Sequence, residues 1–221
     1  MKQLTIEDIE SNPEIRALII QADKVLEKLG YTEHGIRHAK LVSRGAGQIL
    51  TDLGYPPRTV ELARIAGFLH DIGNVIHRDF HAQSSALISF WMLQKMGMPM
   101  AEINPIISAI GNHHEENGLP VNEIAAAVIL ADKSDVHMSR VRNPNMIKFD
   151  IHDRVNYAAR RSGVHVDRLA GVIQMEIEID TSVSSVMEYF EIFLSRMVIS
   201  RKAAKALGTK FELIINNFTL S

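Results

Sequence analysis

The sequence predicts a mainly α-helical protein, a helical bundle followed by a small C-terminal α+β appendage. Two observations lead to this prediction. From residue 12 to about residue 161, apolar residues recur at helical spacing, in segments that Gly and Pro interrupt. Between Ile173 and Asp180, apolar and polar residues alternate strictly, which is the period of a β-strand. We therefore expect a main domain over residues 1–164 and an appendage over residues 165–221.

Helix boundary signals divide the first half of the chain. Asn12 followed by Pro13 is an N-cap residue ahead of proline in the first turn, and the helical pattern continues to Gly30. Thr32 opens the next helix, which ends near Gly54. The remaining segments are apolar runs at helical spacing. Together the patterns predict helices over residues 12–30, 32–54, 59–70, 84–96 and 101–111.

Two further helices complete the expected bundle. Residues 121–138 are nearly apolar on every face before Asp132, so this helix is expected to run through the middle of the bundle. Burial there would shield Asp132 from bulk water. Asn143-Pro144 then breaks the pattern, and a last helix follows over residues 150–161.

The appendage is expected to contain two strands and a long helix. The alternating strand is followed by a helix over residues 182–207, which Gly208 caps, and by a second strand over residues 211–215. The sequence leaves open whether the strands pair in parallel through the helix, antiparallel, or with another subunit. The appendage could therefore serve oligomerisation, and a homodimer is one option.

Composition excludes several classes of protein. The absence of cysteine excludes disulfides, zinc–thiolate sites, iron–sulfur clusters and thiol nucleophiles. The formal net charge of −2 gives no reason to expect a nucleic-acid polymer or a membrane surface as partner. The N-terminus carries acids and no apolar signal core, and no run of about 18 uncharged apolar residues occurs. A cytoplasmic protein with a small ligand is expected.

Histidines gather in one part of the chain, because seven of the ten lie between residues 34 and 114. His34 and His38 are four residues apart on a predicted helix, so both imidazoles would project from one face. The alternative is that one of them only decorates a polar surface. The pair therefore favours a functional site only modestly.

The dipeptide His70-Asp71 is a stronger signal. It places an imidazole and a carboxylate, both common metal ligands, at the end of an apolar helix. The alternative is that Asp71 caps a turn while His70 packs in the core. Because the flanking segments are apolar, Asp71 would be buried, and a buried charge is costly unless it is paired or bound to a metal. The context favours a metal site.

Two more elements carry donors of the same kind. His113-His114 follows an apolar helix, although a solvated loop ahead of Glu115 is an equal alternative. Asp132 follows six largely apolar residues in the expected central helix, where an unpaired carboxylate would be unfavourable.

The order and spacing of these histidines and aspartates along the chain resemble the pattern of the HD superfamily of metal-dependent phosphohydrolases. The signature H…HD…D corresponds to His38, His70-Asp71 and Asp132, and the segments HAKLV, LARIAGFLHDIGN and IAAAVILADKSD are also similar. The match spans about residues 30–140. The resemblance implies an HD-domain helical bundle in which these four residues hold a divalent metal (Mn, Fe, Mg, Co or Ni), with Asp71 best placed to bridge to a second one.

The extra histidines resemble the HD-GYP branch, which hydrolyses cyclic di-GMP and holds two or three metals. By that resemblance, His81, His113 and His114 would bind a second ion. The chain departs from the branch in three places: Asn74 stands where a lysine is usual after HDIG, NGLP replaces GYP, and the segment from His70 to His113 is shorter. These departures put cyclic di-GMP as the substrate in doubt.

The resemblance also implies roles in catalysis, with a metal-activated water as the nucleophile. Lys133, beside a ligand, is the first candidate to balance the charge of the phosphate, although a structural ion pair is equally compatible with its position. The candidates behind it are Arg37, Arg78, Arg140 and Arg142.

Other polar residues receive weaker assignments. His34 is a metal ligand, a partner of a ligand, or a proton donor to the leaving group. Asp135 is expected to orient a ligand or Lys133. His77 has a weaker case than His81, and no role is assigned to His137, His152 and His165.

The function expected from this sequence is hydrolysis of a phosphomonoester or phosphodiester, with a small nucleotide-type substrate. Two rivals share the ligand types. One is an HD-fold di-iron oxygenase. The other is a non-catalytic regulatory module that binds metal and nucleotide, with the appendage as its partner surface.

Overall fold

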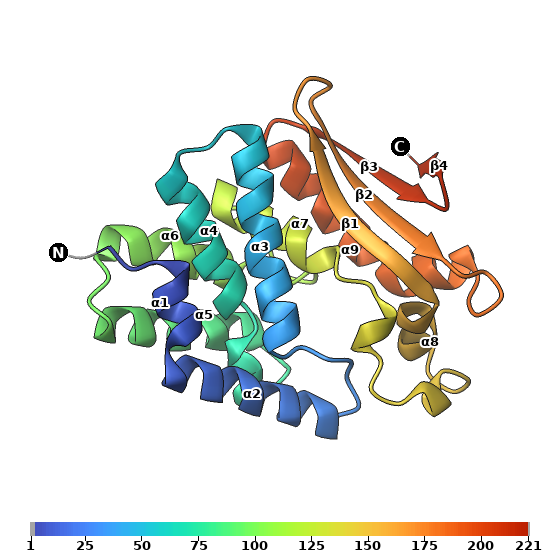
Figure 1. The fold of residues 1–221 in the computed structure, drawn as a ribbon, viewed down its shortest axis with the longest axis horizontal. Helices are drawn as coiled ribbons and strands as arrows, with labels where there is room; N and C mark the ends of the chain where they lie inside the picture. Colours follow the sequence, from blue (N-terminus) through green and yellow to red (C-terminus); the bar gives the residue numbers. More distant parts are fainter. Residues whose placement is uncertain (1–2, 221) are drawn as a thin grey trace.

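The computed structural model describes residues 3–220 and consists of a helical bundle beside a smaller module with a four-stranded sheet (Figure 1). This arrangement confirms the predicted fold class. The short 3-10 helix η1 (Ile72–Val75) links two helices of the bundle. The bundle helices are α1 (Ile6–Ser11), α2 (Pro13–Lys28), α3 (Ile36–Leu53), α4 (Pro57–Leu69), α5 (His81–Lys95), α6 (Met100–Gly111) and α7 (Glu123–Lys133).

Local capping explains several helix boundaries. The side chain of Asn12 accepts hydrogen bonds from the first backbone N–H groups of α2, and Pro13 occupies the first turn, as predicted. Gly54 ends α3 in the left-handed conformation, with φ 83°. Helix α1 was not predicted; Thr5 and Asp8 begin it through a reciprocal capping box.

Helix α3 begins four residues later than predicted, so His34 lies outside the helix that carries His38, although their ring centroids are only 5.3 Å apart. Residues 31–34 are not helical, because long-range partners hold their backbone. The N–H of Glu33 donates to the carbonyl of Arg140, 2.8 Å away, and the N–H of His34 donates to Asp23. His34 therefore lies in the segment before α3, and the predicted pairing of two imidazoles on one helix is wrong.

Two other helices differ from their predicted ranges. Helix α5 already begins at His81, after Phe80 adopts the left-handed conformation with φ 57°. Helix α7 ends at Lys133, five residues before the predicted end at residue 138. It contacts α3, α4, α6 and α9, and every residue from Ile124 to Lys133 is buried. The prediction that this helix runs through the middle of the bundle is confirmed.

The C-terminal module contains more strands than predicted. Its elements are α8 (Ile151–Ala158), β1 (Ala159–Asp167), β2 (Val172–Ile179), α9 (Val186–Ala206), β3 (Lys210–Ile215) and β4 (Phe218–Leu220). The sheet order is β1-β2-β3-β4, with antiparallel pairs at both edges. The two predicted strands, β2 and β3, pair in parallel, and α9 forms their connection.

Strand β1 was missed because an edge strand carries a weak hydrophobic signal. Of its nine residues, only Ala159 is buried. The predicted helix over residues 150–161 took in its first residues. The domain boundary expected between residues 164 and 165 falls inside this strand.

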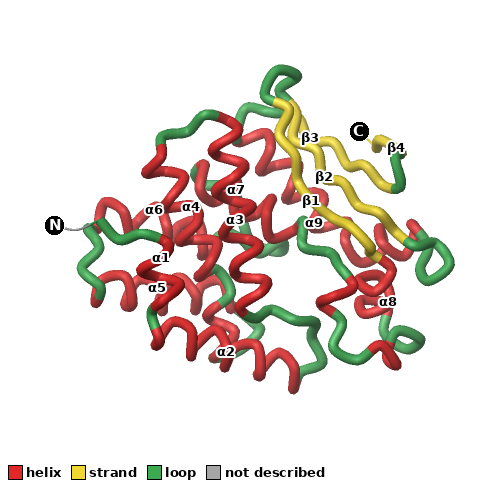
Figure 2. Tube along the Cα trace, viewed as in Figure 1, coloured by secondary structure: helices red, strands yellow, loops and turns green. Residues whose placement is uncertain are grey.

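Helix α9 lies between the sheet and the bundle (Figure 2). Ala203 and Ala204 belong to the bundle core with the residues of α7, whereas Tyr189 and Phe193 pack with the inner face of the sheet. The module is thus packed onto the bundle through α9. None of the helices within residues 3–220 combines the length and apolar character needed to cross a membrane.

Candidate metal centre

The predicted ligands converge from four parts of the bundle. His38 lies in the first turn of α3, and Asp132 lies at the end of α7. His70 caps the C-terminus of α4, and Asp71 follows where the helix gives way to η1. Because Asp71 has left the helix (φ −106°, ψ 4°), two adjacent side chains can turn toward one point. The expected grouping of His38, His70, Asp71 and Asp132 is what the structure has.

These four side chains form the first ligand group. The Nε2 atoms of His38 and His70 are 3.2 Å apart. Oδ1 of Asp132 lies 3.4 Å and 3.7 Å from these two nitrogens, and Oδ2 of Asp71 lies 3.8 Å and 3.5 Å from them. Ligands about 2.1 Å from one ion are roughly 3–3.5 Å from each other, so the group has nearly the size that a divalent metal requires.

A second ligand group shares Asp71. Its other oxygen, Oδ1, lies 3.4 Å from Nε2 of His81 and 3.6 Å from Nε2 of His113. His81 is in place because Gly73 lets η1 approach the first turn of α5, where a side chain would meet backbone atoms. Asp71 therefore directs one oxygen toward each group, which is the geometry of a carboxylate that bridges two metals.

The histidines present the same nitrogen to the centre. In each ring Nδ1 donates a hydrogen bond to an oxygen 2.7–2.8 Å away, so Nε2 is the nitrogen available to the centre. Four acceptors are backbone carbonyls and one is a carboxylate. The pairs are His34 with Thr32, His38 with Asp135, His70 with Gly67, His81 with Arg78 and His113 with Ile110.

The surroundings of the candidate ligands shift the pKa values of their side chains. Burial lowers the pKa of His81 to about 3 and also lowers the pKa of His113, so both rings are neutral near pH 7. The pKa values of Asp71 and Asp132 stay well below the usual range despite burial, because histidines and, for Asp132, Lys133 surround them. Neutral imidazoles and ionised carboxylates are the forms that bind metal.

Asp135 contacts the candidate ligand His38, as one of the two roles expected for it requires. It accepts the Nδ1 proton of His38 at 2.7 Å, and Arg37 donates to both of its oxygens at 3.2 Å and 2.8 Å. Arg140 is a further partner, 3.7 Å away. Burial lowers the pKa of His38, but hydrogen bonds with Asp132 and Asp135 outweigh that effect and raise it. Arg37 and Arg140 are therefore committed to Asp135.

Lys133 lies in a buried ion-pair chain. Its Nζ is 2.6 Å from Oδ2 of Asp132 and 2.6 Å from Oε2 of Glu115. Lys133 thus holds the oxygen of Asp132 that faces away from the histidines. These distances match the structural ion pair, the second role left open for Lys133. Glu115, for which the sequence predicted no role, also lies 3.3 Å from Nδ1 of His114 and 3.4 Å from Nε of Arg196.

His114 stands apart from the compact ligand groups within residues 3–220. Its nitrogens face Glu115 and Glu116, at 3.3 Å and 4.0 Å, and its ring centroid is 4.8 Å from that of His81. His77 is solvent-exposed and receives a hydrogen bond from the backbone of Asp79. The structure therefore places His81 and His113 with the ligands, and His114 beside them.

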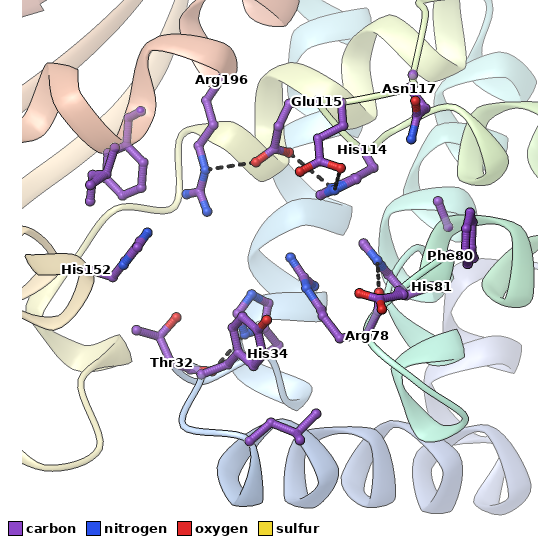
Figure 3. A pocket seen from close by; sticks show the side chains of 18 of the residues that line it. Thr32, His34, Arg78, Phe80, His81, His114, Glu115, Asn117, His152 and Arg196 are labelled. Atoms are coloured by element: carbon purple, nitrogen blue, oxygen red, sulfur yellow. Dashed lines mark hydrogen bonds and ion pairs between the residues drawn. The ribbon is translucent and has the colours of Figure 1, made fainter. Parts of the chain in front are cut away.

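A cavity of about 610 Å³ opens beside the centre (Figure 3). His34, Arg78, His81 and His114 line it from the bundle, and the C-terminal module supplies another wall from α8 and α9. His152, to which the sequence assigned no role, lies on that wall. Arg142, by contrast, pairs with Asp23 and does not line the cavity.

The fold and the centre define a helical domain with a cluster of His and Asp side chains of the kind that can hold a metal ion. Residues 35–137 match the family model of the HD domain. An uncharacterised protein of Methanocaldococcus jannaschii is 32% identical over 57% of this chain and 56% of its own length. Ribonuclease Y of Lawsonia intracellularis is 31% identical over 48% of this chain, and that of Aquifex aeolicus is 34% identical over 56%.

Residues 35–137 of the chain are thus similar to the HD domain. The resemblance drawn from the ligand order is confirmed. The chain spans about half the length of the archaeal relative, at 56%, and about a fifth of the two ribonucleases, at 19% and 20%. HD domains in general bind divalent metals and act as metal-dependent phosphohydrolases.

Proposed function

We propose that this protein is a phosphohydrolase with two divalent metals, acting on a small nucleotide-type substrate. The observation that carries the proposal is the position of Asp71, whose two oxygens lie 3.4–3.8 Å from separate pairs of histidine Nε2 atoms. One ion would be held by His38, His70, Asp71 and Asp132, and the other by Asp71, His81 and His113. His114 lies beside this second group, and we assign it as a further ligand of the second ion.

Metals bound here would supply a hydroxide-like water at neutral pH and would polarise the phosphoryl oxygen. The protein's own residues perform the remaining tasks. Lys133 and Asp135 fix the orientations of Asp132 and His38. Arg78, which lines the cavity, is the cation of the bundle that we assign to the phosphate charge.

His34 is assigned to proton transfer or ligation through its Nε2 atom. Burial keeps its pKa well below the usual range, so the ring is neutral near pH 7 and carries no imidazolium proton to give to a leaving group. Of the roles expected for His34, the proton donor is therefore the least compatible with its surroundings.

The size of the cavity supports a small substrate. About 610 Å³ lies in the usual range for small-molecule sites, roughly 300–1,000 Å³. Because the C-terminal module supplies one wall, the cavity suits a nucleotide better than a long polymer. Two relatives are ribonucleases by name, which makes a ribonucleotide monoester or diester the first substrate to examine.

The test is hydrolysis by protein loaded with Mn²⁺, using nucleoside monophosphates, dinucleotides and bis(p-nitrophenyl) phosphate. We expect turnover that Asp71→Ala abolishes. His165→Ala is the matched control, because this imidazole is exposed on the sheet and lies 3.6 Å from the carboxylate of Glu176. Metal binding without hydrolysis of any substrate would favour the regulatory module, and O₂ consumption with iron would favour the oxygenase.

A further inference from the structure

One cation at the cavity comes from outside the HD domain. Arg196 lies in α9, within the C-terminal module, and lines the same cavity as His34, His81 and His114. Figure 3 shows its guanidinium directed into the cavity from the wall opposite His34. The family match ends at residue 137, so this residue is a contribution of this chain's C-terminal segment.

The position of Arg196 is fixed on both sides. Its guanidinium carbon lies 4.3 Å from the ring centroid of Phe193, which is itself almost fully buried, at 1% exposure. Its Nε faces Oε1 of Glu115 at 3.4 Å. Stacking on an aromatic ring and pairing through Nε hold the planar group in one orientation.

The two terminal nitrogens of Arg196 are then available to a ligand. Among residues 3–220, neither Nη1 nor Nη2 has a hydrogen-bonding acceptor, although the side chain is only 20% exposed. A guanidinium with Nε already paired presents a two-pronged donor that matches a phosphate. The more exposed cations of α9 do not line the cavity.

Glu115 connects Arg196 to the metal centre through short contacts. It also pairs with Lys133, which in turn contacts the ligand Asp132, with both distances at 2.6 Å. In the chain, Glu115 is two residues after the ligand His113. Arg196 is therefore linked to the candidate ligand Asp132 through Glu115 and Lys133, and it lines the cavity that opens beside the centre.

We propose that Arg196 binds the phosphate of the substrate from the side opposite the HD domain, so that the C-terminal module forms part of the active site and selects phosphorylated small molecules. This inference rests on the proposed function, since it names a substrate-binding group of the same site. It gives the module a role that needs no second subunit.

The test uses binding as well as turnover. Inorganic phosphate and adenosine 5′-monophosphate are titrated into the Mn²⁺-loaded 221-residue protein by calorimetry, with Arg196→Gln, Arg196→Lys and the control Arg201→Gln. Arg201 is on α9, is exposed and does not line the cavity. We expect Arg196→Gln to weaken phosphate binding roughly 10- to 100-fold, Arg196→Lys to restore part of the loss, and Arg201→Gln to change nothing.

Metal content and melting temperature of each variant separate a binding role from a positioning role. Retained metal with weakened phosphate binding supports the proposal. Wild-type phosphate affinity in Arg196→Gln overturns it, and so does loss of metal in that variant, which would make Arg196 a positioning residue for Glu115. Absence of phosphate binding by the wild type also overturns it.

Turnover distinguishes this proposal from the proposed function. Hydrolysis that persists in Arg196→Gln with an unchanged KM would leave the phosphohydrolase in place and remove Arg196 from its site. Phosphate binding that depends on Arg196 in a protein that hydrolyses nothing would retain the phosphate site and remove the hydrolase.

Discussion

Replacing Asp135 by Asn tests whether residues behind the ligands control the metal centre. The Asp135 carboxylate accepts the Nδ1 proton of His38 at 2.7 Å and neutralises Arg37 and Arg140. An amide at this position keeps the shape of the side chain but removes the charge that holds His38 in its ligand tautomer. The variant therefore weakens the first metal site without removing any ligand.

The expected magnitudes follow from burial. Partners of metal-bound histidines typically contribute 10- to 100-fold to metal affinity, which is about 1.4–2.7 kcal/mol. Stability should fall as well, because Arg140 is 2% exposed and would lose its charge partner, a change that costs about 3 kcal/mol for a buried pair. For a chain of this size that corresponds to a melting temperature roughly 6–12 °C lower.

Metal affinity is measured by competition with a fluorescent chelator at a temperature where both proteins are folded, and stability by calorimetry on metal-free protein. Glu176→Gln is the matched control, since it also removes a carboxylate 3.6 Å from a histidine, but on the exposed face of the sheet. Wild-type metal affinity in Asp135→Asn would refute the reasoning, whatever happens to stability.

Three further predictions concern other parts of the molecule. His113→Ala should reduce the metal content from two ions to one per chain by elemental analysis, and loss of both ions would contradict separate sites. Gly73→Ala should lower stability by about 1–3 kcal/mol and weaken the second site, because a Cβ there meets the backbone at His81; an unchanged melting curve would contradict this close approach. Glu188 has a pKa lowered to about 2 from 4.5 by its hydrogen bonds to the backbone of Ser185 and to Arg154, so its stabilising effect is complete above pH 4.5 and is lost as the pH falls toward 2. Glu188→Gln should therefore be less stable than the wild type at pH 7 and equal to it near pH 2 in denaturant titrations, and a constant difference at both pH values would oppose this.

The clustering of the candidate ligands could be predicted because the sequence carries their signal locally. His70-Asp71 lies at the end of an apolar helix, and Asp132 lies near the end of a helix that is buried along its length, so burial of charge is visible without the fold. Most of the bundle helices could be predicted from the helical spacing of their apolar residues, which is also a local signal. The C-terminal strands β2 and β3 were visible for the same reason, because one face of each is buried.

Contacts between residues that are far apart in the sequence could not be predicted, because no local pattern encodes them. His34 lies outside α3 because the segment before that helix is held by Arg140, more than a hundred residues further along the chain. The role of Asp135 depends on Arg37, 98 residues away. Arg196 faces Glu115 only because α9 packs on the bundle, and no local pattern records that contact. Such contacts decide which cations are committed to ion pairs and which face the cavity.

The central claim is that Asp71 bridges two divalent metals, and metal stoichiometry tests it most directly. Elemental analysis after loading with Mn²⁺ and desalting should give two ions per chain for the wild type and none for Asp71→Ala, with His165→Ala matching the wild type. A single ion in the wild type, or stoichiometric metal retained in Asp71→Ala, would contradict the claim.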